Sequence, residues 1–426
     1  MNLRNRDKDI IWHPYTQMKR WPEAIGISKA QGATLTREED GTEILDAISS
    51  WWVTLHGHSH PYIAEKIHQQ LLKLEHCIFA GFTHAAAVEL AERLLPLLPG
   101  DMARIFYSDN GSTAVEVALK MAHQFHQNRG EIKKTKIIAL EGAYHGDTFG
   151  AMSVSARSLF TEQFNDMLFD VIFIPFPGTD REENTLNSLE KALQTAEISA
   201  LIVEPLLQGS VGMRMYPPST LEKMFLLCRQ YETLIIADEV LTGFYRTGTM
   251  FACDQLPTAQ PDIVCLSKGL TGGTLPMGIT ACTAAIFDAF LSEDAHKTLY
   301  HGHSFTANPV GCAAGLASLD LLLGDDCQAS IRRIMDFHGT KIESLRAHPK
   351  VKDARQCGTI LAIEIETGSA TDYLNQRRDF IYKFFLDRQI LMRPLGNIVY
   401  ILPPYCTTNE QLQSVYDGIN ELLNVI

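Results

Sequence analysis

Residues 233–238 read Thr233-Leu234-Ile235-Ile236-Ala237-Asp238, an apolar run that ends on a carboxylate. A second run, Asp262-Ile263-Val264-Cys265-Leu266-Ser267, ends directly before Lys268. Neither run alternates apolar and polar residues, so each predicts a strand that is buried on both faces, as in a parallel sheet covered by helices. The carboxyl ends of such strands form the edge where α/β proteins carry their chemistry. We therefore expect Asp238 and Lys268 to lie at one site.

Further apolar runs alternate with helical stretches between about residues 104 and 306. The additional predicted strands cover residues 104–107, 136–140, 171–174 and 200–203. The predicted helices cover residues 113–128, 185–196 and 219–231, the last with Ser219 as N-cap and Glu222 three positions later. This alternation predicts an α/β fold, with a mainly parallel sheet sandwiched by helices.

The two ends of the chain have a different character. Residues 33–36 and 43–46 flank the turn Asp40-Gly41, a pattern that predicts a hairpin. A long helix is expected at 309–323, followed by mixed α and β sequence. We expect both ends to build one smaller α+β domain. The predicted boundaries are residues 1–50 for its N-terminal segment, 51–310 for the large domain and 311–426 for its C-terminal part.

Composition narrows the class of protein. The 426 residues are 46% hydrophobic and 20% charged, and the formal net charge is −13, which argues against a nucleic acid or an anionic membrane as partner. The N-terminus is polar and lacks the apolar stretch of a secretory signal, and no apolar run is long enough to span a membrane. Nine scattered cysteines without a Cys-x-x-Cys pair indicate reduced thiols. We expect a cytoplasmic protein.

Histidines alternate at positions 56, 58 and 60 and again at 301 and 303. Alternate residues of a strand share a face and can chelate a metal. However, Gly57 and Pro61 make the first cluster a turn, and no acidic or cysteine ligand is close in sequence. We expect no metal site.

Two more predicted strands end in residues that suit a flat, phosphorylated ligand. Gly111 and Ser112 follow one strand and open a helix, where backbone N–H groups and the helix dipole attract phosphate, although an ordinary N-cap has the same sequence. Tyr144 stands between glycines after the next strand, where its ring either stacks on a flat ligand or packs in the core. Glu204 ends a further strand. One cofactor needs this set, because pyridoxal 5'-phosphate requires a lysine for its aldehyde and an acid against its pyridinium nitrogen.

Several longer stretches carry a resemblance to a known family. They are residues 11–16 (Ile-Trp-His-Pro-Tyr-Thr), 49–52 (Ser-Ser-Trp-Trp), 144–150, 212–216, and 393–394 with 403–405. With them the chain resembles, nearly end to end, the class III aminotransferases of fold type I, which depend on pyridoxal phosphate. The resemblance is closest to members that act in biotin biosynthesis. It implies transfer of an amino group from S-adenosylmethionine to 8-amino-7-oxononanoate in alternating half-reactions, giving 7,8-diaminononanoate.

The resemblance also implies roles for individual residues of the cofactor site. Lys268 would hold the cofactor and move a proton, and Asp238 would pair with the pyridinium nitrogen. Gly111 and Ser112 would bind the phosphate, and Tyr144 would stack near the ring and contact substrate. The family's pattern further implies a homodimer with shared active sites, in which His303 and Ser304 bind the phosphate held by the neighbouring subunit.

The implied substrate residues come from other parts of the chain. Trp51 and Gly302 would line the substrate channel, Tyr15 would recognise the keto acid, and Arg393 would pair with its terminal carboxylate, a bidentate task that suits guanidinium. The indole rings of Trp12, Trp51 and Trp52, together with Tyr15, would give the channel its aromatic walls.

Two positions depart from the family's pattern. Ser304 replaces a threonine and keeps the hydroxyl. Tyr245 replaces a glycine in Gly243-Phe244-Tyr245-Arg246-Thr247-Gly248. Tyrosine is strained there if its φ is positive, and otherwise its ring narrows the channel near Arg246. The identity of the amino donor depends on this region, so lysine as donor stays an alternative.

Other readings stay open at this point. Another class III aminotransferase of ω-amino acids or diamines would share the cofactor residues. A cofactor-binding regulatory protein of the same fold would retain them without turnover. A nucleotide-dependent dehydrogenase would need Gly-x-Gly-x-x-Gly after an early strand, and the chain has none there.

Overall fold

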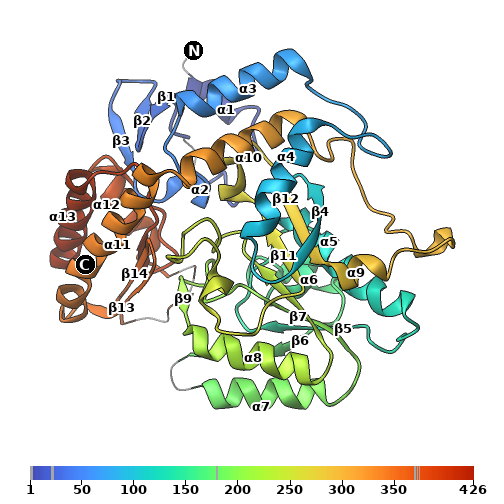
Figure 1. Ribbon diagram of the computed structural model, residues 1–426. Coiled ribbons are helices and arrows are strands. Elements are labelled where there is room, and N and C mark those ends of the chain that lie inside the picture. Colours follow the sequence, from blue (N-terminus) through green and yellow to red (C-terminus); the bar gives the residue numbers. More distant parts are fainter. Residues whose placement is uncertain (1–2, 21–23, 179–180, 369–370, 372, 374) are drawn as a thin grey trace.

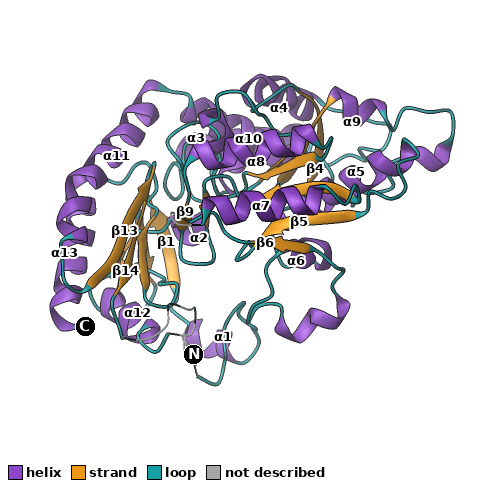
Figure 2. Cartoon of the chain, turned by 90° about the horizontal axis from the view of Figure 1, so that it is seen from below, coloured by secondary structure: helices purple, strands orange, loops and turns teal. Residues whose placement is uncertain are grey.

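The computed structural model describes residues 3–20, 24–178, 181–368, 371, 373 and 375–426. Its central sheet has seven strands in the order β4-β12-β11-β10-β7-β5-β6. Strands β4, β5 and β6 of this sheet are labelled in Figure 2. The bounds of the seven strands are β4 Met102–Ser108, β5 Lys136–Leu140, β6 Ile172–Ile174, β7 Ile198–Val203, β10 Leu234–Asp238, β11 Ile263–Leu266 and β12 Gly278–Thr283. All six predicted strands are present, and the predicted α/β class is confirmed.

The seventh strand, β12, was not predicted. It runs antiparallel between β4 and β11, whereas β5, β6, β7, β10 and β11 pair in parallel. Only the short 3₁₀ helix η4, Lys268–Thr271, separates β11 from β12. Without a crossover helix the chain turns straight back, so the new strand must be antiparallel.

Helices cover both faces of this sheet. Helix α5 (Gly111–Asn128) packs on one face, and α7 (Glu182–Leu193) and α8 (Pro218–Gln230) lie side by side on the other (Figure 1). Strand β10 shows the alternation: Ile236 belongs to the apolar cluster of α5, and Ile235 and Ala237 belong to the cluster of α8. Both faces are buried, as the apolar run predicts.

The predicted cap of α8 is wrong. Pro217 is the N-cap and Pro218 the first helical residue, so Ser219 lies inside the first turn. Proline suits that first position because its φ is already helical and its missing N–H has no partner there. The Glu222 carboxylate instead accepts hydrogen bonds from the Thr258 hydroxyl and from the Ala259 N–H.

Strands from both ends of the chain share a second sheet. Strands β2 and β3 form the predicted hairpin, and β15 adds to β3 in parallel through Leu45 and Ile390. The bounds are β1 Ile27–Gln31, β2 Thr34–Arg37, β3 Glu43–Asp46 and β15 Ile390–Leu391. Met1 and Asn2, at the start of the predicted first segment, lie outside the described residues. The domain boundaries after residues 50 and 310 stay predictions.

A third sheet, antiparallel, combines β13 (Val351–Cys357), β14 (Ile360–Ile365) and β16 (Ile398–Ile401). It lies beside α11, α12 and α13 (Figure 1). The helices of the C-terminal part of the chain are α10 Pro309–Leu322, α11 Asp325–Arg346, α12 Arg378–Leu386 and α13 Asn409–Val425. The remaining α-helices and strands are α1 Leu3–Lys8, α2 Ser49–Trp52, α3 Pro61–Lys73, α4 Ala85–Leu94, α6 Phe149–Val154, α9 Ala284–Asp288, β8 Leu207–Gln208 and β9 Arg214–Met215. No helix in the described ranges is both long and apolar enough to cross a membrane.

Candidate active site

The carboxyl ends of the central strands meet at a cavity of about 670 Å³. Five residues predicted from the sequence line it together: Gly111, Ser112, Tyr144, Asp238 and Lys268. They lie at or just after the ends of β4, β5, β10 and β11. In the sheet β10 and β11 are neighbours, β12 lies between β4 and β11, and β7 lies between β10 and β5. The cavity therefore lies where a parallel sheet is expected to carry its ligand.

Lys268 is half-buried at the start of η4, with a φ of 45° that a lysine rarely adopts. Its Nζ lies 4.7 Å from the centre of the Trp52 ring. Burial lowers the pKa of Lys268 from its ordinary 10.5 to about 8, although the carboxylates of Asp238 and Glu204 raise it. A lysine with a lowered pKa is partly neutral near pH 7, and a neutral amine is a nucleophile and a base.

Asp238 is held by a neighbour that the sequence pattern does not single out. Its Oδ2 lies 2.7 Å from Nδ1 of His145, and its Oδ1 accepts a hydrogen bond of 3.1 Å from the Val240 N–H. His145 is itself buried, 3% exposed. In the sequence, only the position of His145 next to Tyr144, after β5, could have pointed to this residue. The pair fixes the direction in which the Asp238 carboxylate faces the cavity.

The start of α5 is arranged as an anion site. Asn110 is the N-cap, and its side chain accepts the N–H of Thr113 at 3.0 Å. The first N–H groups of a helix have no partner inside it, so those of Gly111 and Ser112 remain for a ligand. Gly146 packs against this turn with a φ of +133°, and a Cβ there would lie 2.3 Å from Ser112 Oγ. Because a Cβ would clash with Ser112, the cradle formed by the Gly111-Ser112 turn and Gly146 requires glycine at position 146.

Tyr144 stands at the rim of the cavity and is held at both ends. Its N–H donates to Glu204 Oε1 at 3.0 Å, and its hydroxyl lies 3.3 Å from that of Tyr15. The Tyr15 hydroxyl donates to Asp147 Oδ2 at 2.6 Å. Burial raises the pKa of Glu204 to about 7, and burial also raises the pKa of Tyr144. Asp147, another residue without a predicted role, thus ties the N-terminal segment to the site.

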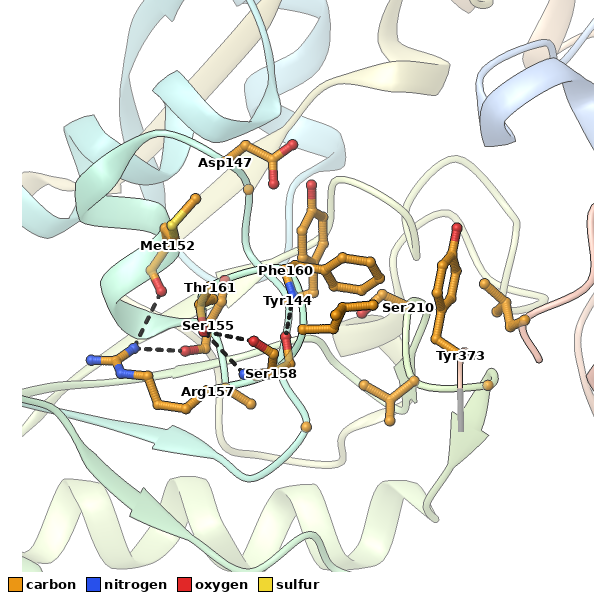
Figure 3. A pocket seen from close by; sticks show the side chains of 18 of the residues that line it. Tyr144, Asp147, Met152, Ser155, Arg157, Ser158, Phe160, Thr161, Ser210 and Tyr373 are labelled. Atoms are coloured by element: carbon orange, nitrogen blue, oxygen red, sulfur yellow. Dashed lines mark hydrogen bonds between the residues drawn. The ribbon is translucent and has the colours of Figure 1, made fainter. Parts of the chain in front are cut away.

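A second cavity of about 480 Å³ adjoins Tyr144 and Asp147 (Figure 3). Phe160 and Tyr373 are among its walls. Arg157 also lines it, but its guanidinium donates to main-chain carbonyls, among them that of Ser155 at 3.1 Å (Figure 3). The guanidinium of Arg157 is therefore already hydrogen-bonded to the main chain.

A third cavity of about 340 Å³ is lined by Tyr15, Phe160, Arg378 and Arg393. The ring centre of Trp51 lies 5.5 Å from that of Tyr15 and 4.7 Å from Arg393 Cζ. The predicted substrate residues Tyr15, Trp51 and Arg393 therefore lie together. Trp12 does not join them, since it is 88% exposed.

The turn that carries Trp51 rests on Asp46. The two oxygens of its buried carboxylate accept the N–H groups of Ile48 at 3.1 Å and Ser50 at 2.6 Å, and His58 Nε2 lies 2.9 Å from Oδ2. An acidic neighbour of the histidine cluster therefore exists in space, although none is close in sequence. It supports a strained turn, because Ser49 and Ser50 have positive φ values.

Three predicted residues do not reach this site within one chain. Gly302, His303 and Ser304 lie on the segment between α9 and α10, which extends away from the central sheet (Figure 1). None of them is among the residues that line the three cavities described here. Their role at the site of a second subunit stays a prediction.

Tyr245 has a φ of 69°, so it adopts the left-handed backbone that favours glycine. Arg246 next to it is only 2% exposed. Its guanidinium donates to the Pro403 carbonyl at 2.8 Å and to Ser49 Oγ at 2.9 Å. Of the two readings of Tyr245, the strained backbone is the one observed, and Arg246 joins the two ends of the chain.

Comparison with known proteins gives one family along nearly the whole chain. The family model Aminotransferase class-III matches residues 16–423. The chain is 47% identical to the adenosylmethionine-8-amino-7-oxononanoate aminotransferase of Synechococcus elongatus, over 98% of this chain and 99% of that relative. The protein of the same name from Geobacter sulfurreducens is 38% identical, over 100% of this chain and 98% of its own.

Solved structures agree. The adenosylmethionine-8-amino-7-oxononanoate aminotransferase of Methanocaldococcus jannaschii has a TM-score of 0.91 at 35% identity, covering 98% of both chains. The omega transaminase of Pseudomonas jessenii, solved in complex with PMP, has a TM-score of 0.92 at 25% identity, covering 100% of this chain and 98% of its own. The chain therefore belongs to the class III aminotransferase family.

Proposed function

We propose that the protein transfers the amino group of S-adenosylmethionine to the 7-oxo carbon of 8-amino-7-oxononanoate, giving 7,8-diaminononanoate in biotin biosynthesis. It would act in the cytoplasm as a homodimer with pyridoxal 5'-phosphate. The observation that carries the proposal is the meeting of Lys268, Asp238 and the Gly111-Ser112 turn in one cavity. Relatives named for this reaction, at 35% to 47% identity over nearly the full length, support the choice of substrates.

The cavity offers partners for three polar groups of the cofactor of this family. Lys268 would hold the aldehyde carbon, Asp238 the ring nitrogen, and the N–H groups of Gly111 and Ser112 the phosphate. Bound pyridoxal phosphate withdraws electrons from the carbon that carries the amino group. His303 and Ser304 of the partner subunit would complete the phosphate site of the proposed dimer.

Lys268 would then move the proton that the reaction requires. With a pKa of about 8, its amine is present in both the neutral and the charged form near neutral pH, so Nζ can take up a proton and return it. Asp238, oriented by His145, would keep the ring nitrogen protonated through a charge-assisted hydrogen bond. Tyr144 would cover the ring from the rim of the cavity.

The same site would bind donor and acceptor in turn. Tyr15 and Trp51 give the acceptor's methylene chain an aromatic wall, and Arg393 offers its terminal carboxylate a bidentate partner. Gly302 of the partner subunit would line the same channel. Aromatic walls that lead to an arginine match a long ω-carboxylated substrate.

The direct test supplies 8-amino-7-oxononanoate with S-adenosylmethionine and measures 7,8-diaminononanoate by mass spectrometry. We expect product with this donor and little with lysine in its place. Product with lysine alone would transfer the proposal to a lysine-dependent enzyme, and no product with either donor would refute it.

A variant tests the role of the amine. Lys268→Ala should abolish turnover and remove the visible absorbance of the lysine-bound cofactor, at roughly 420 nm. Full activity in this variant would contradict the assignment of Lys268.

A further inference from the structure

Two cavities adjoin the cofactor site, and they differ in the charge that they offer. Arg157, in the wall of the 480 Å³ cavity, donates to the carbonyl of Ser153 at 2.9 Å and to that of Ser155 at 3.1 Å. Figure 3 shows the bond to Ser155. The 340 Å³ cavity is lined by Arg20, Arg378 and Arg393. An anionic group of a substrate should therefore enter the 340 Å³ cavity.

Arg378 is held against the wall of this cavity by an aromatic ring. It begins α12, its Cζ lies 4.5 Å from the centre of the Tyr373 ring, and its Nη2 donates to the Tyr373 hydroxyl at 3.1 Å. Its Nε is buried and has no hydrogen-bond partner in the described part of the chain. Stacking on the ring fixes the guanidinium plane, and Nη1, which lies 3.6 Å from Asp379 Oδ1, is the group of this arginine that remains for a ligand.

Arg393 is held by Trp51, the ring centre of which lies 4.7 Å from Arg393 Cζ. Arg378 and Arg393 both line the 340 Å³ cavity, so both guanidinium groups border the same volume. Among the described residues that line the cavity, Asp379 is the one carboxylate, and its side chain is 63% exposed, 3.6 Å from Arg378 Nη1.

We propose that Arg378 is a second binding residue for the terminal carboxylate of the acceptor, opposite Arg393. This inference rests on the proposed function. A carboxylate has two oxygens and accepts about four hydrogen bonds, so a single guanidinium fork leaves half of them open. A second fixed guanidinium satisfies them, and it favours acceptors whose chain length brings the carboxylate between both cations.

The test compares Arg378→Ala with Arg377→Ala in enzyme saturated with pyridoxal phosphate. Arg377 is the neighbouring arginine, exposed and absent from the cavity wall, so its variant removes the same charge from the same helix end. We expect Arg378→Ala to raise the KM for 8-amino-7-oxononanoate about 10- to 100-fold, the effect of losing one charge-assisted hydrogen bond. The donor half-reaction with S-adenosylmethionine, followed by single-turnover absorbance, should keep its rate, and Arg377→Ala should stay within about twofold of the parent.

A substrate analogue identifies the group that Arg378 recognises. With the terminal carboxylate replaced by a carboxamide, the parent and Arg378→Ala should have the same KM. Arg378→Lys should recover part of the affinity for the acid, because it restores charge without the planar fork.

The outcomes separate the two proposals. A parent enzyme that does not aminate the keto acid refutes the proposed function. An active parent whose Arg378→Ala variant keeps the acceptor KM overturns the role of Arg378 alone. Equal loss of both half-reactions in Arg378→Ala and Arg378→Lys also overturns it, since a residue that contacts only the terminal carboxylate of the acceptor leaves the donor step unchanged.

Discussion

Protein stripped of its cofactor should recombine with added pyridoxal phosphate at a rate that is half-maximal near pH 8. Only the neutral amine of Lys268 can attack the aldehyde, so the rate follows the fraction of Lys268 that is unprotonated. A lowered lysine pKa means that this fraction rises with pH and is nearly complete above pH 9.

The size of the effect follows from the surroundings of Lys268. Burial takes its pKa from 10.5 to about 8, against the opposing influence of Asp238 and Glu204. At pH 7 about one amine in ten is then neutral, compared with about one in three thousand for an exposed lysine. Recombination at that pH should be about 300-fold faster than an unperturbed lysine would allow.

Stopped-flow absorbance between pH 6 and pH 10 measures this rate. The reaction of the cofactor with a lysine derivative in solution, recorded at each pH, corrects for the cofactor's own titration. A corrected rate that still climbs at pH 10, as for the free amine, would refute the claim that burial governs the reactivity of Lys268.

Two further substitutions test the cradle and the junction between the chain ends. Gly146→Ala would bring a Cβ to 2.3 Å from Ser112 Oγ at a φ of +133°, so we expect at least about tenfold weaker cofactor binding, read as absorbance per mole of protein. A Gly146→Ala variant that binds a full complement of cofactor would contradict the described cradle. Gly339→Ala, on α11 with open space around it, is the matched control and should load normally. Arg246→Met removes hydrogen bonds to the buried carbonyls of Pro403 and Thr54 and should lower the free energy of unfolding by about 3 kcal/mol in urea titrations, where an unchanged midpoint would speak against this role.

The sequence predicts the strands and the cofactor cavity well because both depend on local pattern. Continuous apolar runs mark β10 and β11, and a parallel sheet brings their carboxyl ends together. The sequence alone is therefore enough to place Asp238 and Lys268 at one edge of the sheet. Strand β12 was missed because only the short 3₁₀ helix η4, and no crossover helix, separates it from β11. The cap at Ser219 was wrong because two prolines before it begin the helix first.

Contacts between distant segments are the part that local pattern does not contain. His145 and Asp147 act through partners far along the chain, Asp238 and Tyr15, and nothing near them in sequence marks those hydrogen bonds. The link between Asp46 and His58 depends in the same way on how the Ser49–Trp52 turn folds back. Tyr15, Trp51 and Arg393 were found only through family resemblance.

The pairing of Leu45 with Ile390 has a consequence for how the protein is made. Strand β3 leaves the ribosome roughly 350 residues before β15, a delay of about 20 to 70 seconds at usual rates of synthesis. During that interval the nascent hairpin has an open edge, which can pair with another chain. Chaperone dependence and losses to aggregation during expression should therefore originate at the early β1–β3 meander, and slower translation should aggravate them.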